Sequence, residues 1–252
     1  MASGCKLLNG KTAVITGCNR GIGKAVLEAF ADNGASVFAC VRKENITFSK
    51  FIKSLSEKNS VHIFPVYFDA GNIDEIKSAI KHIVGFQHPV DILVNNAGIG
   101  YSALFQMSTV DKLKEVFDIN FIAPFLITQY IAKLMVRQKS GSIINISSIA
   151  GIDGACGRSV YGSSKAALMC MTKVIAAELG GSGIRANCIA PGLTETEMIS
   201  GMPEETISEL IKNSSIKRIG QPSEVADIAV FLASDLSSFI TGQVIRADGG
   251  VI

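Results

Sequence analysis

The sequence lacks the blocks of like charge that bind nucleic acid and the residue clusters that bind metals. Its 252 residues contain 24 Lys and Arg against 22 Asp and Glu, a formal net charge of +2. We therefore expect no nucleic-acid partner. The six cysteines and three histidines are scattered without Cys-x-x-Cys pairs or ligand-like spacing. No metal site is predicted, and the cysteines are expected to be reduced, mostly buried thiols of a cytoplasmic protein.

Long hydrophobic runs and linkers are also missing. The longest apolar run, Phe121 to Val136, is interrupted by a proline and two polar residues and is shorter than a membrane span. We expect no membrane partner and interpret the run as a core or subunit-interface helix. The stretch before the first strand is too short for a signal peptide. Without repeats or low-complexity linkers, residues 1–252 are predicted to form a single domain.

The sequence does contain a regular alternation of β-type and α-type patterns. We predict strands at 12–16, 36–41, 61–67, 91–94, 142–146, 184–189 and 242–246, and helices at 24–32, 48–57, 73–84, 109–136, 160–179, 204–212 and 222–233. The strand segments are short apolar runs, as expected for parallel strands buried on both faces. The alternation predicts a single-domain doubly wound (Rossmann) α/β fold with about seven parallel strands and helices on both faces of the sheet.

A glycine-rich turn directly follows the first predicted strand. Gly17, Gly21 and Gly23 have the spacing Gly-x-x-x-Gly-x-Gly and lead into a helix. Bare backbone at such a turn lets a pyrophosphate approach the positive end of the helix, although plain structural turns also use glycine. Ligands of parallel sheets bind beyond the C-terminal strand ends. Polar or turn residues follow six predicted strands: Gly17, Arg42, Asp69, Asn95, Ser148 and Pro191.

Tyr161 and Lys165 lie four residues apart in the helix predicted after the fifth strand. That spacing puts both on one helix face, and the loop before the helix can fold Ser148 back beside them. An ammonium ~4 Å away, helped by a cationic cofactor ring, would stabilise the tyrosine anion by ~3–4 kcal/mol and lower the pKa of the phenol. Taken alone, the motif is more typical of an ordinary amphipathic helix pair than of a catalytic site.

Together these motifs resemble those of the classical short-chain dehydrogenase/reductase family. The resemblance rests on Thr16 to Gly23, Asn95 to Gly98, Asn120, Ser148, Tyr161 with Lys165, and Pro191-Gly192, and it covers nearly the whole chain. It implies an NAD(P)-dependent oxidoreductase with a catalytic tetrad of Asn120, Ser148, Tyr161 and Lys165. In that tetrad Asn120 anchors a water relay to Lys165. Ser147 is expected to serve the strand end instead.

The resemblance also implies a set of cofactor-binding residues: Gly17, Asn19, Arg20, Gly21, Ile22, Gly23, Arg42, Asp69, Ala70, Asn95, Ala97, Gly98, Tyr161, Lys165, Pro191, Gly192, Thr194 and Thr196. No carboxylate stands directly after the second strand, where it would repel the extra phosphate of NADP. Arg42 is there instead, and two guanidiniums, Arg20 and Arg42, facing one phosphate favour NADP(H). Each of two residues also has an alternative to cofactor binding. Arg42 could be a solvated loop residue, and Asp69 could cap the helix that begins near Ile73.

Within the family, the C-terminal sequence motifs, at 191–198, 220–224, 231–235, 240–243 and 248–250, look most like those of 3-oxoacyl-[acyl-carrier-protein] reductases, which reduce a ketoacyl thioester with NADPH. Dehydrogenases of sugars, polyols or other small carbonyls have the same motifs and stay open as an alternative. A non-enzymatic nucleotide sensor is a third possibility. The segment 194–214 is expected to cover the substrate. Basic residues for an acidic acyl carrier are present before the fifth strand (Arg137 and Lys139) but missing before the sixth. The carrier is therefore expected to contribute little.

The two helices predicted at 109–136 and 160–179 carry more apolar side chains than one sheet face can cover. The apolar residues in question are Phe121, Phe125, Ile127, Ile131, Met135, Leu168, Met171 and Val174. Outward apolar surface of this extent marks an interface, and family members pair through the equivalent helices. We therefore expect a homotetramer with two-fold symmetry.

Overall fold

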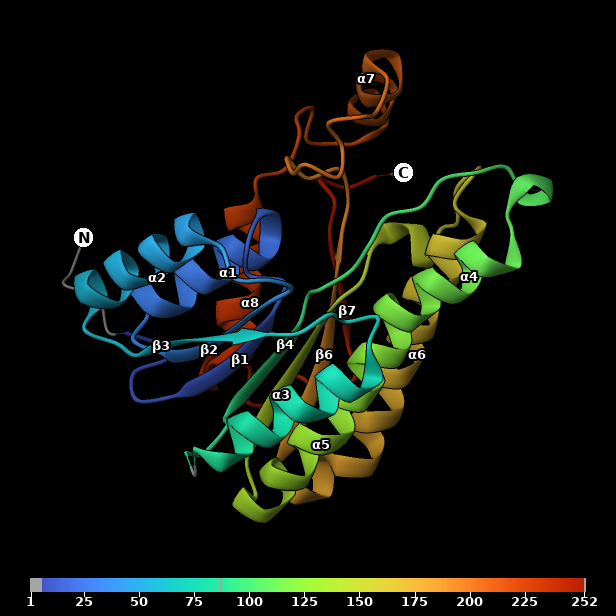
Figure 1. The fold of residues 1–252 in the computed structure, drawn as a ribbon. Helices are drawn as coiled ribbons and strands as arrows, with labels where there is room; N and C mark the ends of the chain where they lie inside the picture. Colours follow the sequence, from blue (N-terminus) through green and yellow to red (C-terminus); the bar gives the residue numbers. More distant parts are fainter. Residues whose placement is uncertain (1–5, 87, 252) are drawn as a thin grey trace.

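A parallel sheet of seven strands forms the centre of the computed structural model, which describes residues 6–86 and 88–251 (Figure 1). The strands are β1 (Thr12–Thr16), β2 (Ser36–Val41), β3 (Ile63–Tyr67), β4 (Ile92–Asn95), β5 (Gly141–Ile146), β6 (Ile184–Pro191) and β7 (Val244–Ala247). Their order is β3-β2-β1-β4-β5-β6-β7, and every pairing is parallel. The predicted doubly wound fold is confirmed, and the order reverses between β1 and β4.

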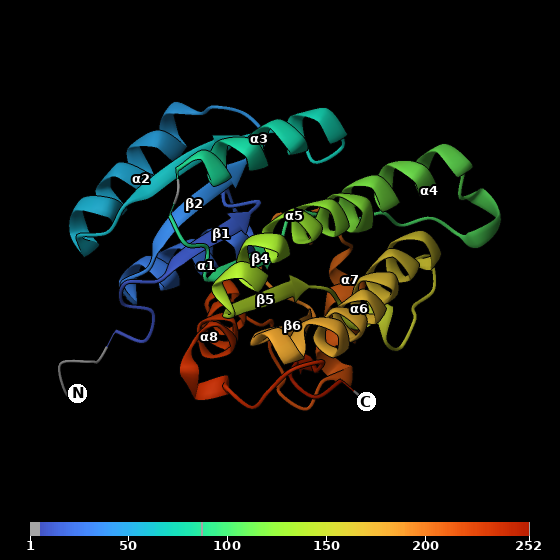
Figure 2. The same ribbon diagram turned by 90° about the horizontal axis from the view of Figure 1, so that it is seen from below.

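Helices cover both faces of this sheet. On one face, α1 (Gly21–Asp32), α2 (Ile46–Asn59) and α8 (Pro222–Ala233) share a core with the strands. On the other face lie α3 (Ile73–Gly85), α5 (Ala123–Gln138) and α6 (Ser159–Leu179). Figure 2 shows α4 (Val110–Phe117) continuing the line of α5 and lying beside α6. Only α7 (Glu204–Asn213) protrudes without a buried residue.

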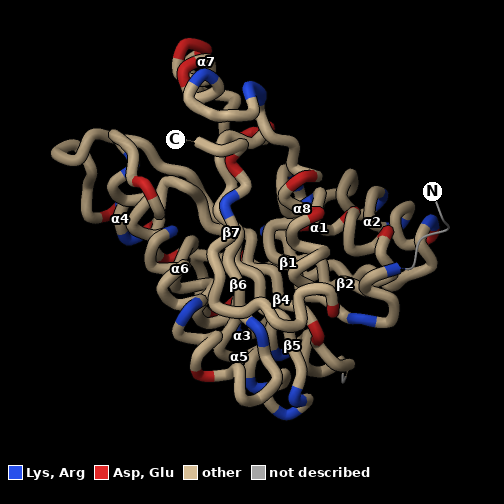
Figure 3. The backbone as a smooth tube through the Cα atoms, turned by 180° about the vertical axis from the view of Figure 1, so that it is seen from behind, with Lys and Arg blue, Asp and Glu red and all other residues tan. Residues whose placement is uncertain are grey.

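Charge is almost confined to the helices and loops. Figure 3 shows acidic and basic residues on the protruding α7 and around the periphery. Within the seven strands, Arg185 and Arg246 are the only charged residues. This distribution explains why the short apolar runs predicted the strands so closely.

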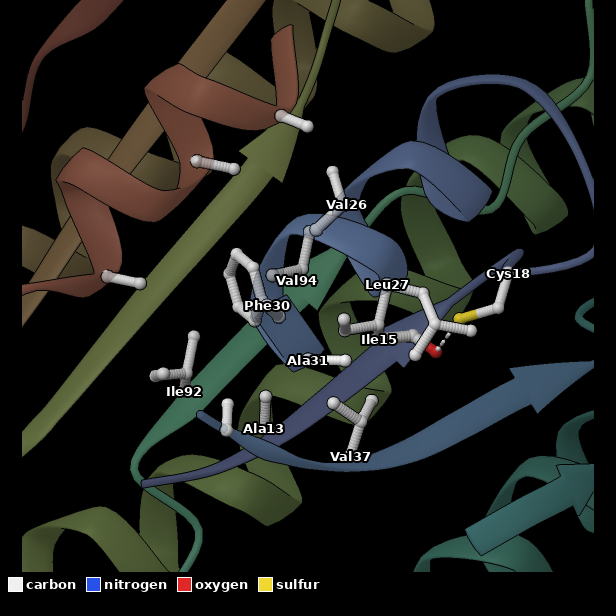
Figure 4. Packing of buried hydrophobic residues seen from close by; sticks show 14 of the residues in the cluster. Ala13, Ile15, Cys18, Val26, Leu27, Phe30, Ala31, Val37, Ile92 and Val94 are labelled. Carbon is white, nitrogen blue, oxygen red and sulfur yellow. Dashed lines mark hydrogen bonds between the residues drawn. The ribbon is translucent and has the colours of Figure 1, made fainter. Parts of the chain in front are cut away.

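The core beneath the glycine turn is built by α1. Figure 4 shows Val26, Leu27 and Phe30 of this helix pointing toward the sheet, where Ala13, Ile15, Ile92 and Val94 meet them. All seven side chains are buried, and Phe30 has no exposed surface. Burial of one such aromatic side chain contributes about 1.5–3 kcal/mol, so this packing holds the turn in place.

The expectation of one uninterrupted helix at 109–136 is wrong. A π turn, Asp118–Ile122, separates α4 from α5. Pro124 has no N–H to donate to the carbonyl of Asn120 four residues earlier, so regular α-helix cannot pass this point. Single π turns inside helices frequently occur at functional sites, and this one contains Asn120.

The helical segment Val110–Gln138, which includes this turn, is long and apolar enough to cross a membrane by length and composition. In the structure, however, it packs against the protein itself. Ile131 and Met135 of α5 have no exposed surface, and the helix contacts α3 and β5. It is therefore a core helix, as its interrupted apolar run predicted.

Gly23 tests how tightly the glycine turn is packed. A Cβ at this position would collide with the carbonyl oxygen of Gly17 and the side-chain nitrogen of Asn96. We expect Gly23→Ala to lower the free energy of unfolding by ~1–3 kcal/mol or more because backbone cannot yield to the methyl group. Urea denaturation measures the change. Gly180→Ala is the matched control, since a Cβ there meets nothing within 4 Å. Equal stability of the two variants would contradict the close packing.

Candidate active site

Asn96 joins the C-terminal ends of β1 and β4. Its side-chain nitrogen donates to the carbonyl oxygens of Thr16 and Gly17 at 2.9 and 3.2 Å. In return, the Thr16 hydroxyl accepts from the backbone N–H groups of Asn96 and Ala97, both at 3.0 Å. Neither Thr16 nor Asn96 was among the predicted site residues. Both residues lie inside motifs that carry the family resemblance, so the sequence does contain a signal for them. The Asn96 amide and the Thr16 hydroxyl bind backbone groups, which is a structural role.

The turn between β1 and α1 fits a pyrophosphate. Gly17 has φ +75°, a conformation that favours glycine, and lies against Ala97. The first turn of α1 has no side-chain cap and no acidic residue. Its free N–H groups and the helix dipole are therefore available to an anion. The residues present thus fit the dinucleotide that the sequence implied, with Asn19 exposed and Ile22 packed against the core.

The two arginines predicted to face one phosphate are held by different carboxylates. Arg20 pairs with Glu197, which follows β6, and both side chains are exposed. Arg42 pairs with Asp69, which follows β3, through Nε and Nη2 at 2.8 and 2.7 Å. Each guanidinium is thus bound to its own carboxylate, and their shared contact with one phosphate stays a prediction. Arg42 alone stands at the end of β2.

The alternative that Asp69 caps the helix near Ile73 is excluded, because the cap of that helix is another residue. The second carboxylate oxygen of Asp69 accepts from the N–H of Gly71 at 2.9 Å, in the turn that also contains the half-buried Ala70. The cap of α3 is Asn72, whose side chain accepts from the N–H groups of Asp74 and Glu75.

Asn95 turns its side chain into the protein. The amide donates to Asn145 Oδ1 at 2.8 Å and Thr128 Oγ1 at 2.9 Å, and the residue is buried. A cofactor contact by Asn95 is thereby limited to its backbone. Gly98 lies further along this loop, where a Cβ would come within 3.4 Å of Lys165 Nζ and 3.1 Å of Asn120 Oδ1.

The segment after β6 brings further predicted residues together. Pro191 ends the strand, and a Cβ at Gly192 would meet Asp248. Thr194 is buried and donates to the carbonyl of Gly192 at 3.2 Å. Thr196 lies against Gly21, where a Cβ would stand 3.2 Å from its methyl group. This segment therefore closes one side of the glycine turn.

Tyr161 stands at the N-terminal end of α6 with the phenol almost completely buried. Burial raises its pKa, against the opposing effects of the Ser148 hydroxyl and the Arg158 charge. In this structure Lys165 alone does not outweigh burial, and the lowering expected from Lys165 together with a cationic cofactor ring stays a prediction. Lys165 Nζ lies 5.9 Å from the ring centre, and desolvation of the phenolate dominates. A raised pKa keeps the phenol protonated at neutral pH.

Lys165 is buried on α6 and donates from Nζ to the carbonyl oxygen of Ile146 at 2.9 Å. Burial lowers its pKa to about 8. Ser147 donates to the carbonyl oxygen of Lys165 at 2.8 Å, so its hydroxyl ties the end of β5 to α6. Ser148 begins the next short turn, with its hydroxyl accepting from the N–H of Ala150 at 3.2 Å.

Asn120 reaches this group from the π turn. Its side chain exchanges two hydrogen bonds with the backbone of Ile99, at 2.9 and 3.0 Å, and donates to Ser164 Oγ at 3.1 Å. Ser164 precedes Lys165 on α6, so Asn120 fixes the loop after β4 against α6. The four predicted tetrad residues thus converge at the ends of β4 and β5.

An ion-pair network supports the loop that carries Ser148. Arg246 of β7 binds both oxygens of Asp153 at 2.8 and 2.7 Å and one oxygen of Asp248 at 2.7 Å. These pairs raise the pKa of Arg246. No local sequence signal predicts this network, because Asp153 and Arg246 are 93 residues apart.

Comparisons with known proteins agree with this geometry. A family model described as enoyl-(acyl carrier protein) reductase matches residues 17–252. The 3-oxoacyl-[acyl-carrier-protein] reductase FabG of Thermotoga maritima is 40% identical over 247 residues, 97% of this chain and 99% of that protein.

Two solved structures have nearly the same fold over nearly the whole chain. A 3-oxoacyl-[acyl-carrier protein] reductase of Brucella melitensis with bound NAD is 32% identical, with a TM-score of 0.88 over 98% of this chain and 92% of that one. A proposed NAD(P)-dependent gluconate 5-dehydrogenase of Beutenbergia cavernae with bound NADP is 29% identical, with a TM-score of 0.90 over 98% of each chain.

Fold, site and relatives together define an oxidoreductase that interconverts CH–OH and keto groups with a nicotinamide nucleotide. The chain belongs to the short-chain dehydrogenase/reductase family.

The buried ammonium of Lys165 is expected to destabilise the cofactor-free protein. Its pKa is lowered from 10.5 to about 8. Below pH 8 the ammonium is charged in the folded protein, which then carries the full free-energy cost of burying that charge. The contribution of Lys165 to stability should recover between pH 8 and 10.5, where only the unfolded chain keeps this proton, while the buried thiols of Cys40 and Cys188, whose pKa values are raised, lose their contribution above about pH 9. Lys165→Met should raise the free energy of unfolding at pH 7 by ~1–3 kcal/mol, and this difference from the wild type should shrink as the pH rises from 8 to 10.5. Urea denaturation across that pH range tests both effects, and a less stable variant would contradict them.

Proposed function

We propose that this protein is an NADPH-dependent reductase of 3-oxoacyl thioesters, with Asn120, Ser148, Tyr161 and Lys165 as its catalytic residues. The observation that carries the proposal is their convergence beside a glycine turn whose helix end is free to receive an anion. The relatives named as 3-oxoacyl-[acyl-carrier-protein] reductases support the substrate class. The gluconate 5-dehydrogenase neighbour favours the alternative, a sugar acid or polyol.

The side chains divide the proton chemistry among them. Ser148 donates a hydrogen bond to the ketone oxygen, and Tyr161 gives that oxygen its proton as general acid. Burial keeps the phenol protonated until then. The ammonium of Lys165 offsets the charge left on Tyr161, and Asn120 holds the loop that borders Lys165 and anchors the proton relay. When bound, the reduced nicotinamide supplies the hydride.

The preference for NADP(H) rests on Arg42. Its guanidinium stands at the end of β2, where the ribose phosphate of NADP would lie, and Asp69 holds it in place. The other predicted cofactor contacts line the path from Gly17 to Thr196. The segment from 194 to 214 would cover the substrate, since it joins the glycine turn at Thr196 and packs Met198 on Gly100.

The acyl carrier is expected to contribute little, although the reason differs from the one that the sequence offered. Arg137 and Lys139 stand before β5, whereas Ser148 follows that strand. Six residues of strand, about 20 Å, separate the two ends. These basic residues therefore lie away from the mouth of the site of their own protomer. The protein is expected to act in the cytoplasm, with no membrane or nucleic-acid partner.

We still propose a homotetramer, although the outward apolar surface available for its interfaces is smaller than the sequence suggested. Ile127, Ile131, Met135, Leu168 and Met171 are buried within the protomer. Outward apolar side chains remain at Phe125 and Val174 on α5 and α6, 44% and 48% exposed, and at Phe239, 102% exposed. Such exposed residues are suited to two interfaces of a dimer of dimers.

Tyr161→Phe tests the catalytic assignment together with the substrate class. The variant loses the proton donor and keeps the ring packing, so we expect a ~10²–10⁴-fold loss of kcat or more. NADPH binding should barely change. NADPH oxidation with thioester, sugar and simple ketone substrates measures turnover, and the best substrate decides between the two functions. Near wild-type reduction by the variant would show that another group donates the proton.

Arg42→Ala tests the cofactor preference. Loss of charge-assisted hydrogen bonds to the phosphate should weaken NADPH binding by about 1.5–3 kcal/mol and leave NADH nearly unchanged. Titration calorimetry with both nucleotides measures this. Lys43→Ala is the control, because Lys43 is the next residue, is exposed, and forms no ion pair with any residue that the structure describes. Equal weakening for NADH and NADPH would place Arg42 away from the phosphate.

Light scattering tests the assembly. We expect the mass of four chains at micromolar concentration. Replacing the outward Phe125 by Glu should dissociate the tetramer without unfolding the protomer, because the side chain is 44% exposed. A wild-type monomer under these conditions would refute the proposed assembly.

A further inference from the structure

Arg158 places a positive charge beside Tyr161. It precedes α6 as the N-cap residue and stands three residues before Tyr161, so the two side chains are neighbours at the start of the helix. The guanidinium carbon lies 5.9 Å from the centre of the Tyr161 ring. Its charge reaches the phenol, since it acts to lower the pKa of Tyr161.

In the described part of the chain, Arg158 forms no ion pair. Its single hydrogen bond there, from Nη1 to the carbonyl oxygen of Tyr101, is long at 3.5 Å. The residue is half-buried. Partly buried charges usually have a charged or hydrogen-bonding partner, because desolvation otherwise costs free energy. A guanidinium in this state is poised to receive an anion.

The surroundings of Arg158 offer few acids. Asp153 is the only carboxylate in the loop 149–158, and Arg246 binds both of its oxygens. The adjacent segment 99–110 contains no Asp or Glu. Glu197, on the segment that would cover the substrate, pairs with Arg20. The charge of Arg158 is therefore left for a ligand.

We propose that Arg158 binds the carboxylate of a short keto acid, and that reduction of such an acid to a hydroxy acid is a further activity of this site. This inference rests on the proposed function, because it needs the ketone oxygen held by Ser148 and Tyr161. The ketone oxygen would lie ~3 Å from the phenol of Tyr161, and the carboxylate ~2.8 Å from the guanidinium of Arg158. One or two carbons, the ketone carbon included, connect these two groups. Acids with two or three carbons between the ketone carbon and the carboxylate are less suited.

The reaction balances without a further reagent. The ketone carbon takes a hydride from the reduced nicotinamide, and the ketone oxygen takes a proton from Tyr161. The products are the hydroxy acid and the oxidised nucleotide. The carboxylate keeps its charge throughout and accepts two parallel hydrogen bonds from the guanidinium, a geometry that arginine matches and lysine does not.

The test compares acetoacetate with its methyl ester, which has the same ketone and no charge. The readout is the ratio of kcat/KM for the acid to kcat/KM for the ester, because any effect of Arg158 through Tyr161 acts on both substrates and cancels. In Arg158→Gln we expect this ratio to fall by about 10- to 100-fold, mainly through KM of the acid. Arg158→Lys should restore part of it. Arg137→Gln, an exposed arginine at the far end of the sheet, should leave it unchanged.

The outcomes separate this inference from the proposed function. An unchanged ratio in a folded Arg158→Gln protein would overturn the inference. So would an equal loss for acid and ester with a shifted pH profile, which would assign Arg158 to Tyr161 instead. Reduction of the ester and of thioesters without any reduction of the acid would overturn the inference alone. Failure to reduce any ketone would overturn the proposed function as well.

Discussion

The hydrogen bonds of Asn96 hold the two halves of the site together. The strand order reverses between β1 and β4, and a crevice opens where neighbouring loops diverge at such a point. Asn96 bridges it by holding the carbonyls of Thr16 and Gly17. The glycine turn depends on this bond, because it holds the carbonyl oxygens at the end of β1. The predicted tetrad depends on it too, because the same loop continues to Gly98 and Ile99, which border Lys165 and Asn120.

A second constraint is the burial of polar groups on α6. Lys165 and Ser164 are buried, and each is satisfied by a neighbouring element: the carbonyl of Ile146 receives Nζ, and Asn120 donates to the serine hydroxyl. Buried polar groups cost free energy unless every partner is present. Helix α6 can therefore pack only in the register that brings the end of β5 and the π turn into place, so the same contacts that stabilise the fold specify the geometry of the candidate site.

The strands and most helices could be predicted because apolar runs and amphipathic periods are local signals. The four converging residues followed from strand ends and from the resemblance. Three features could not be predicted in this way. The π turn at Asn120 required the consequence of Pro124 for a specific carbonyl. The sign of the pKa change at Tyr161 depended on burial, which outweighed a cation. The pairing of Arg20 and Arg42 with separate acids depended on loops far apart in sequence, as did the pair of Asp153 and Arg246.

The pair of Asp153 and Arg246 also bears on the order in which the site is completed. All four tetrad residues are contained in the chain up to Lys165, but the loop that carries Ser148 is tied to β7, the last strand. During synthesis a chain that has produced β1 to β6 already contains all four residues of the predicted tetrad while this tie is missing. The loop acquires its final support only when the last edge of the sheet has been added.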